Sequence, residues 1–248
     1  MNSSLKLAYL YAAHTQRHLE DLPFWLGLAH QADGPILELG CGTGRILLSV
    51  LQSGLPIIGL DRDPDMLAVL KEKSCKAQKS PAIVQADMSA FNFEQLFSLI
   101  ILPCNTISTL SDSSRVTMLN AVVDHLAEGG IFATSLPNPL LLSNLPEHAE
   151  PEIEESFPHP LDGAPVKVSS SWEHDQHTFS ILWDYEYGLP SGDIEHLTLT
   201  SSHGLIPISQ YLAEFETAGL NILHQYGDFN KRLFNRRANS LIFVAQKP

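Results

Sequence analysis

Residues 36–45 read Ile-Leu-Glu-Leu-Gly-Cys-Gly-Thr-Gly-Arg, a short apolar run that leads into glycines at 40, 42 and 44. Glycine lets the backbone turn sharply and approach a ligand with no side chain in the way. The helix expected to open near Thr43 presents unpaired N–H groups at its first turn. The stretch therefore predicts a nucleotide-type loop between a strand and a helix, holding a small and partly anionic ligand.

The neighbours of the glycines narrow the class of ligand. A dinucleotide-binding loop has its last glycine one residue later, where this chain has Arg45, so NAD is disfavoured. Glu38 would repel a pyrophosphate, whereas it attracts an ammonium such as that of S-adenosylmethionine. A second apolar run, residues 56–60, ends in Asp61, about twenty residues after the first glycine, where a carboxylate can accept both ribose hydroxyls.

The first half of the chain alternates strand and helix patterns. Right-handed crossovers gather the carboxyl ends of parallel strands at one edge, where ligands bind in such sheets. We therefore expect Glu38, Asp61, Asp87 and residues 103–105 to line one crevice. Besides the first two runs, strands are predicted at residues 83–88, 97–102 and 131–136, and helices at about 64–75 and 113–127.

In this order the segments resemble the class I S-adenosylmethionine-dependent methyltransferases, in particular the small-molecule type that includes aminosugar N-methyltransferases. The resemblance implies an α/β fold with a Rossmann-like, doubly wound, mostly parallel seven-stranded sheet, and it covers nearly the whole chain, loosely over about 145–205. In the tail, Tyr211–Gly219 resembles the family's last helix, and residues 226–228 and 241–248 resemble its closing pair of strands. The other segments that carry the resemblance are residues 38–45, 59–66, 85–88 and 126–130.

The resemblance also implies roles for particular residues. The three glycines would hold the methionine end of S-adenosylmethionine, Asp61 the ribose, and Asp87 the adenine amine. Met66 and Met88 would lie at the adenine, although packing explains a methionine equally well. Cys41 and Cys104 are expected as small buried residues rather than as catalytic thiols. The expected cofactor-binding residues are Tyr11, Glu38, Gly40, Cys41, Gly42, Gly44, Asp61, Arg62, Met66, Asp87, Met88, Leu102, Pro103 and Asn105.

The chain changes character after about Pro137. Alternating runs at residues 166–172, 178–185 and 194–200 predict antiparallel strands, with turns at 175–176 and 189–193. We expect residues 1–34 to form an N-terminal helical lid, residues 35–140 and 206–248 the cofactor-binding core, and residues 141–205 a small antiparallel insert of three or four strands that roofs the substrate. The aromatic residues that either wall the acceptor pocket or pack the insert's own core are Trp172, Trp183, Tyr185 and Tyr187.

Methyl transfer asks mainly for geometry, because the sulfonium already makes the methyl group electrophilic. An oxygen or protonated nitrogen acceptor still needs a base, and a neutral histidine or a carboxylate near the insert fits that role. His174 and His177 on a hairpin would not share a face as they would on a helix, so no metal is expected. The candidate bases, which the sequence does not rank, are Glu173, His174, His196 and His203, with His148 and His159.

Composition excludes several classes of protein. The net charge of −13 would repel a phosphate backbone, so no nucleic acid is expected as a partner. The 248 residues contain no run of about 20 apolar residues, so no membrane span is expected. Three scattered cysteines fit a reducing cytoplasm. We expect a cytoplasmic monomer or homodimer that acts on a small-molecule acceptor and releases S-adenosylhomocysteine.

Two alternatives remain open from the residues. One is a non-catalytic module that binds S-adenosylmethionine or S-adenosylhomocysteine, and the other is an NAD-dependent dehydrogenase. An open pocket beside the methyl position favours the enzyme, whereas an insert collapsed onto the loop favours the module.

Overall fold

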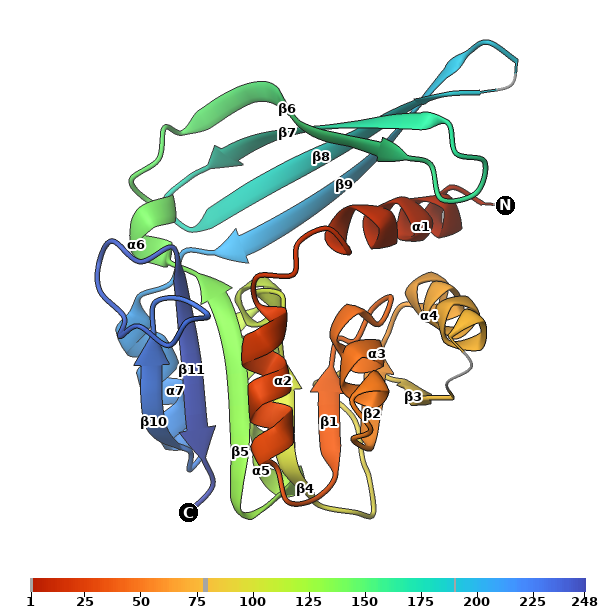
Figure 1. The fold of residues 1–248 in the computed structure, drawn as a ribbon. Coiled ribbons are helices and arrows are strands. Elements are labelled where there is room, and N and C mark those ends of the chain that lie inside the picture. Colours follow the sequence, from red (N-terminus) through yellow and green to blue (C-terminus); the bar gives the residue numbers. More distant parts are fainter. Residues whose placement is uncertain (1, 78–79, 190) are drawn as a thin grey trace.

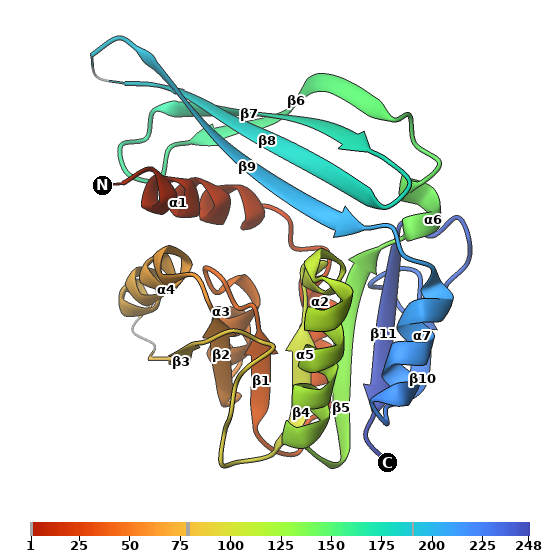
Figure 2. The same cartoon turned by 180° about the vertical axis from the view of Figure 1, so that it is seen from behind.

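Two β-sheets organise the chain, and helices cover both faces of the larger one (Figures 1 and 2). The computed structural model describes residues 2–77, 80–189 and 191–248. The strands of the larger sheet, here called the main sheet, are β1 (Ile36–Leu39), β2 (Ile57–Asp61), β3 (Ala82–Gln85), β4 (Phe97–Leu102), β5 (Leu126–Pro137), β10 (Asn221–Tyr226) and β11 (Ser240–Gln246). They form a seven-stranded sheet in the order β10-β11-β5-β4-β1-β2-β3.

Parallel pairing brings the carboxyl ends of the first five strands to one edge. β1 lies between β2 and β4 and is parallel to both, with Glu38 opposite Gly59 on one side and Ile101 on the other. β2 continues in parallel to β3, and β4 to β5. Only β11 reverses direction, pairing antiparallel with both β5 and β10. The predicted doubly wound, mostly parallel sheet is confirmed.

Helices bury one apolar face each against the main sheet. On one face lie α2 (Leu22–Gln31), α3 (Arg45–Gln52) and α4 (Pro64–Lys76), which contribute the buried Trp25, Leu47 and Leu70. On the other lie α5 (Asp112–His125) and α7 (Ile208–Thr217), which contribute Met118 and Phe215. Figures 1 and 2 show these two layers from opposite sides. Among the described residues, no helix combines the length and apolar character needed to cross a bilayer.

Some predicted boundaries were wrong by a few residues. The third strand ends at Gln85 rather than Met88, because the Asp87 carboxylate accepts hydrogen bonds from Ser89 and turns the chain there. The helix predicted at 113–127 ends at His125, and β5 begins directly after it. The first closing strand is Asn221–Tyr226, upstream of the predicted 226–228.

The smaller sheet, here called the insert sheet, joins the end of β5 to α7. Its antiparallel strands run in the order β6-β7-β8-β9. The sequence pattern did not locate β6, because this edge strand is rich in acids, contains Pro151 and has irregular register with β7. The turn predicted at 175–176 is confirmed, while Pro190 of the turn predicted at 189–193 lies outside the described residues. The elements are β6 (His148–Pro158), β7 (Pro165–His174), β8 (Thr178–Gly188) and β9 (Ile194–Gly204), preceded by the short α6 (Pro139–Leu142).

The N-terminal helix α1 (Ser3–Thr15) lies between the insert sheet and α4 (Figures 1 and 2). Its fully buried Leu10 belongs to the core of the insert sheet, together with Tyr185. On its other side, the small residues Ala8 and Ala12 pack on Val69 of α4. One helix therefore connects the insert sheet to the main domain at the edge where the strands end.

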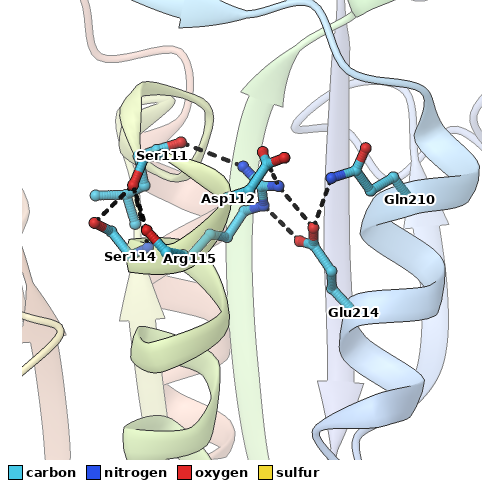
Figure 3. Close-up of polar contacts among 8 residues, drawn as sticks. Ser111, Asp112, Ser114, Arg115, Gln210 and Glu214 are labelled. Atoms are coloured by element: carbon cyan, nitrogen blue, oxygen red, sulfur yellow. Dashed lines mark hydrogen bonds and ion pairs between the residues drawn. The ribbon is translucent and has the colours of Figure 1, made fainter.

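Arg115 ties α5 to α7 through a buried ion pair (Figure 3). The residue is only 2% exposed. Its Nε and Nη2 donate to the two carboxylate oxygens of Glu214, at 2.5 and 2.7 Å, and Nη2 also donates to Asp112. The guanidinium lies 5.0 Å from the ring centroid of Tyr211. Such a bidentate pair restricts both helices to one relative position.

Candidate functional site

The glycine loop follows β1 with three residues in left-handed backbone conformations. Gly40, Gly42 and Gly44 have φ of 64°, 51° and 81°. A Cβ at Gly44 would lie 2.2 Å from Leu70 Cδ1, so this glycine permits close packing of α3 on α4. A Cβ at Gly42 would meet nothing closer than 3.9 Å, so the backbone there faces open space. The loop thus presents bare backbone on one side and is packed tightly on the other.

Glu38 is a buried acid at the end of β1, just before the loop. The residue is 2% exposed, and its Oε2 has no hydrogen-bond partner among the described residues. Burial raises the pKa of Glu38 well above its ordinary value, while the nearby Arg45 guanidinium opposes that rise. A buried, unpaired carboxylate oxygen is costly, and a cationic donor bound in front of it would satisfy it.

Asp61 is held at the end of β2 by two backbone donors. Its Oδ2 accepts from the Gly42 N–H at 2.7 Å and its Oδ1 from the Asp63 N–H at 2.9 Å. Burial raises the pKa of Asp61, and these two hydrogen bonds act against the rise. Each carboxylate oxygen keeps a further lone pair, so the fixed group can still accept hydrogen bonds from a diol.

Asp87 lies beyond β3, at the turn that ends it. Its Oδ1 accepts from both the backbone N–H and the hydroxyl of Ser89, and these bonds lower the pKa of the carboxyl. The second oxygen is left for a ligand. Met66 and Met88 line the same space and also pack on neighbouring apolar clusters, so both of the roles considered for them stay open.

Arg45 connects the glycine loop to the N-terminal segment, a contact that the sequence did not indicate. Its two terminal nitrogens donate to both carboxylate oxygens of Asp21, at 2.5 and 2.7 Å. It also donates to the His18 carbonyl at 3.0 Å. Trp25 Nε1 donates to the same Asp21 carboxylate at 3.0 Å. Arg45 is thus a pairing residue under the N-terminal segment rather than a solvent-exposed helix residue.

A cavity of about 420 Å³ joins the glycine loop to the insert sheet. Two walls come from the strand ends of the main sheet and from α1, and the third comes from β8 and β9. At the β4 end, Cys104 and Asn105 both have φ of 61°, a strained conformation for non-glycine residues that is common at functional sites. The predicted cofactor residues that line the cavity are Tyr11, Glu38, Gly40, Cys41, Gly42, Asp61, Arg62, Met66, Asp87, Met88 and Asn105.

Three predicted cofactor residues lie behind this lining. Gly44 packs against α4, as described above. Leu102 is fully buried, and its carbonyl accepts from the Thr134 hydroxyl at 2.8 Å. The Pro103 carbonyl accepts from the Thr106 hydroxyl at 3.0 Å. The lining residues that the sequence pattern did not single out come mostly from loops and from β9: Thr15, Thr43, Ile46, Asp63, Ala86, Thr106, Thr109, Leu110, Ser114, Leu199, Thr200 and Ser201.

The candidate bases separate clearly in space. Of the residues proposed for this role, His203 lines the cavity. His174 is remote, and both of its ring nitrogens contact backbone carbonyls. His196 pairs with Asp184 on the exposed side of the insert sheet. Glu173 and His148 line a separate depression, and the buried His159 stacks on Tyr187.

His203 is held between two serines. Its Nδ1 lies 2.8 Å from Ser108 Oγ and its Nε2 lies 3.1 Å from Ser201 Oγ. Ser108 Oγ already donates to the Asn105 carbonyl, so it accepts a hydrogen bond from the N–H at His203 Nδ1. Nε2 is then the unprotonated nitrogen, on the side of the cavity-lining Ser201. Burial lowers the pKa of His203, which keeps the ring neutral near pH 7.

Three of the four aromatic residues considered for the acceptor pocket take one of the two predicted roles, and Trp172 takes neither. Trp183 lines the cavity. Tyr185 and Tyr187 are buried in the core between the insert sheet and α1. Trp172 donates its indole N–H to the Pro146 carbonyl and lies outside the cavity lining.

Comparison with known families gives a match for the part of the chain that contains the glycine loop, Glu38, Asp61 and Asp87. The family described as Methyltransferase domain matches residues 36–130. Residues 36–130 of this chain are therefore similar to a methyltransferase domain. The match does not favour the dehydrogenase alternative, in agreement with Arg45 at the position of a dinucleotide loop's last glycine.

Known proteins resemble the chain well beyond the methyltransferase domain. A putative methyltransferase of Bacillus subtilis strain 168 is 22% identical over 227 residues, which are 90% of this chain and 88% of that protein. The crystal structure of an S-adenosylmethionine-dependent methyltransferase from Clostridium acetobutylicum superposes with a TM-score of 0.80 at 16% identity, over 99% of each chain. A SAM-bound amino pentose methyltransferase from Micromonospora echinaspora superposes with a TM-score of 0.72 at 18% identity, over 96% of each chain. The whole fold, insert sheet included, is therefore shared with methyltransferases.

Proposed function

We propose that the chain transfers the methyl group of S-adenosylmethionine to a nitrogen or oxygen atom of a small molecule. The observation that carries the proposal is the single cavity that connects the glycine loop, Glu38 and Asp61 to Trp183, Ser201 and His203 of the insert sheet. A cofactor bound on the loop side leaves the insert side for an acceptor. The open cavity favours an enzyme over a module whose insert has closed onto the loop.

The residues on the loop side fit the polar groups of S-adenosylmethionine. Glu38 Oε2 is buried without a hydrogen-bond partner among the described residues and would receive the ammonium group. Asp61, fixed by its two backbone donors, would accept the ribose hydroxyls. The free oxygen of Asp87 would accept from the adenine amine. When bound, S-adenosylmethionine supplies an electrophilic methyl group, so the protein has only to hold the acceptor in line and exclude water.

On the acceptor side, we propose that residues 141–205 serve as the roof of the site and residues 1–34 as its lid. Trp183 and Leu199 offer apolar surface there, and Thr200 and Ser201 offer hydroxyl groups. This mixture suits a small polar molecule with an apolar face. The amino pentose methyltransferase among the structural relatives supports an amine or hydroxyl on a sugar-like acceptor.

His203 is the base that we propose for the acceptor proton. The proton would move to Nε2 through the Ser201 hydroxyl, while Ser108 holds the opposite side of the ring. The lowered pKa of His203 means that the ring is free to take up a proton at neutral pH.

Calorimetric titration tests the cofactor half of the proposal. Wild-type protein should bind S-adenosylmethionine and S-adenosylhomocysteine, and should not bind NAD. Asp61→Ala should weaken the binding of both sulfur-containing ligands by about tenfold or more, since hydrogen bonds to a charged group contribute about 1.5–3 kcal/mol. The matched control is Asp65→Asn, in the first turn of α4 and outside the cavity lining, and it should bind both ligands as the wild type does. Tight NAD binding, or none of these ligands binding, would overturn the proposal.

A second ligand tests the role of Glu38 within the same experiment. Methylthioadenosine contains the adenosine and the sulfur but lacks the amino-acid end. Glu38→Gln should therefore weaken the binding of S-adenosylhomocysteine by about tenfold or more and leave the binding of methylthioadenosine unchanged. Only S-adenosylhomocysteine has an ammonium group to pair with the carboxylate. Equal losses for both ligands would show that Glu38 supports the loop instead of binding the ammonium.

A further inference from the structure

A cluster of metal-ligating side chains lies away from the glycine loop, where the end of α1 meets the edge strand β6. His14 and the following His18 come from the N-terminal segment, and Glu155 comes from β6. One ligand atom from each of the three lies within 4.8 Å of the other two. Neighbouring Glu154 brings a second carboxylate to the same place. Residues about 140 positions apart in sequence thus converge on one point. Figure 1 shows how α1 lies against the insert sheet.

The separations within this cluster are those of ligands around one ion rather than of hydrogen bonds. Glu155 Oε1 lies 3.4 Å from His14 Nε2 and 3.4 Å from His18 Nε2, and His14 Nε2 lies 3.5 Å from Glu154 Oε2. N–H···O hydrogen bonds span about 2.7–3.2 Å. Tetrahedral zinc with bonds of about 2.0–2.1 Å places its ligand atoms about 3.3–3.4 Å apart.

The remaining contacts leave the ligand atoms free for a cation. Glu155 Oε1 is buried and has no hydrogen-bond partner among the described residues, while Arg17 holds the other oxygen, Oε2. His14 Nδ1 lies 3.1 Å from the hydroxyl of the buried Tyr185. A ring that donates from Nδ1 to that hydroxyl turns the Nε2 lone pair toward the cluster, as neighbours of metal-binding histidines commonly do.

We propose that His14, His18 and Glu155 bind a divalent transition-metal ion of the zinc type, with Glu154 or water as the fourth ligand. Two imidazoles and a carboxylate are borderline donors that suit Zn²⁺ and not Mg²⁺ or Ca²⁺. The carboxylates of Glu154 and Glu155 outnumber the one Arg17 guanidinium, so the site keeps a net negative charge for the cation. The ion would pin the end of α1 to the insert sheet, next to Thr15 of the cavity wall.

Calorimetry on the chelator-treated full chain tests the proposal. Zn²⁺ should bind with one ion per chain, at least tenfold more tightly than Mg²⁺ or Ca²⁺. His18→Ala and Glu155→Gln should each weaken Zn²⁺ binding by tenfold or more. Tyr185→Phe should weaken Zn²⁺ binding less while leaving the fold intact. The matched controls are Glu152→Gln on the same strand and His30→Ala at the exposed end of α2, and both should bind Zn²⁺ as the wild type does.

Spectroscopy separates a built site from loose surface binding. Co²⁺ in place of Zn²⁺ should give the strong visible absorption of a tetrahedral complex, and this absorption should be lost in Glu155→Gln. Circular dichroism of the metal-free variants should match the wild type, because His18 is exposed and Gln keeps the shape of Glu. Absence of a saturable one-to-one Zn²⁺ isotherm, or equal weakening in the controls and the cluster variants, would refute the site. Neither result depends on methyl transfer.

Discussion

Gly44→Ala is the substitution whose cost the structure defines most closely. Gly44 begins α3 with φ of 81°, and an alanine Cβ there would lie 2.2 Å from Leu70 Cδ1. A left-handed conformation costs a non-glycine residue about 1–2 kcal/mol. Overpacking against a fully buried leucine adds about 1–3 kcal/mol, so the free energy of unfolding should fall by about 2–5 kcal/mol.

Gly54→Ala separates the two contributions. Gly54 has φ of 90°, but an alanine Cβ there would meet no heavy atom of the described residues within 4 Å. This control should therefore lose only the backbone cost, about 1–2 kcal/mol. Alanine restricts the unfolded chain equally in both variants, so that effect cancels in the comparison.

Urea unfolding followed by far-ultraviolet circular dichroism measures both values. In the background of Leu70→Ala the 2.2 Å contact is removed and the nearest side-chain atom among the described residues is Leu48 Cγ at 3.3 Å, so the cost of Gly44→Ala should fall close to that of Gly54→Ala. The reasoning is refuted if Gly44→Ala is as mild as Gly54→Ala in the wild-type background, or if Leu70→Ala fails to reduce its cost.

Two further predictions concern charged and titrating groups. Arg115→Met leaves the buried carboxylate of Glu214 without its cationic partner, with Gln210 still donating to it, and should lower the free energy of unfolding in urea by about 3–5 kcal/mol. Glu214→Leu in the same chain should restore most of that loss. A loss below about 1 kcal/mol would contradict the importance given to the ion pair in Figure 3. Because burial lowers the pKa of His203, the unfolded state binds more protons than the folded state once the pH falls below about 6.5, so the free energy of unfolding should fall on acidification through that value. His203→Gln should show a shallower loss between about pH 7.5 and 5.5 than the wild type, and parallel curves would contradict the assignment.

Much of the fold follows from local signals in the chain. The alternation of apolar runs and amphipathic segments predicted the five parallel strands and most of their helices, because each element buries one face and so carries its own period. β4 was located to the residue, at Phe97–Leu102. The sequence pattern did not predict β6, because it is an edge strand with acids on its exposed positions. Its register is set by pairing with β7 and not by an alternating pattern of its own.

The acceptor side of the site depended on contacts between distant segments. The pairing of Asp21 with Arg45 joins residues 24 positions apart, with α2 and β1 between them, and nothing in either local sequence marks it. The candidate histidines looked alike in sequence, yet His203 lies at the cavity while His174 and His196 lie on other parts of the insert sheet.

Local sequence was enough to specify the chemistry of the loop: where the backbone is bare, which acids follow which strands, and hence the class of cofactor. These features are local, since glycine's conformational freedom and the position of an acid at a strand end do not depend on the rest of the chain. Which groups face the acceptor, and which histidines meet Glu155, became clear only from the folded arrangement. Packing of α1 and the insert sheet over the strand ends sets those distances, and such packing is the sum of many contacts that no single segment encodes.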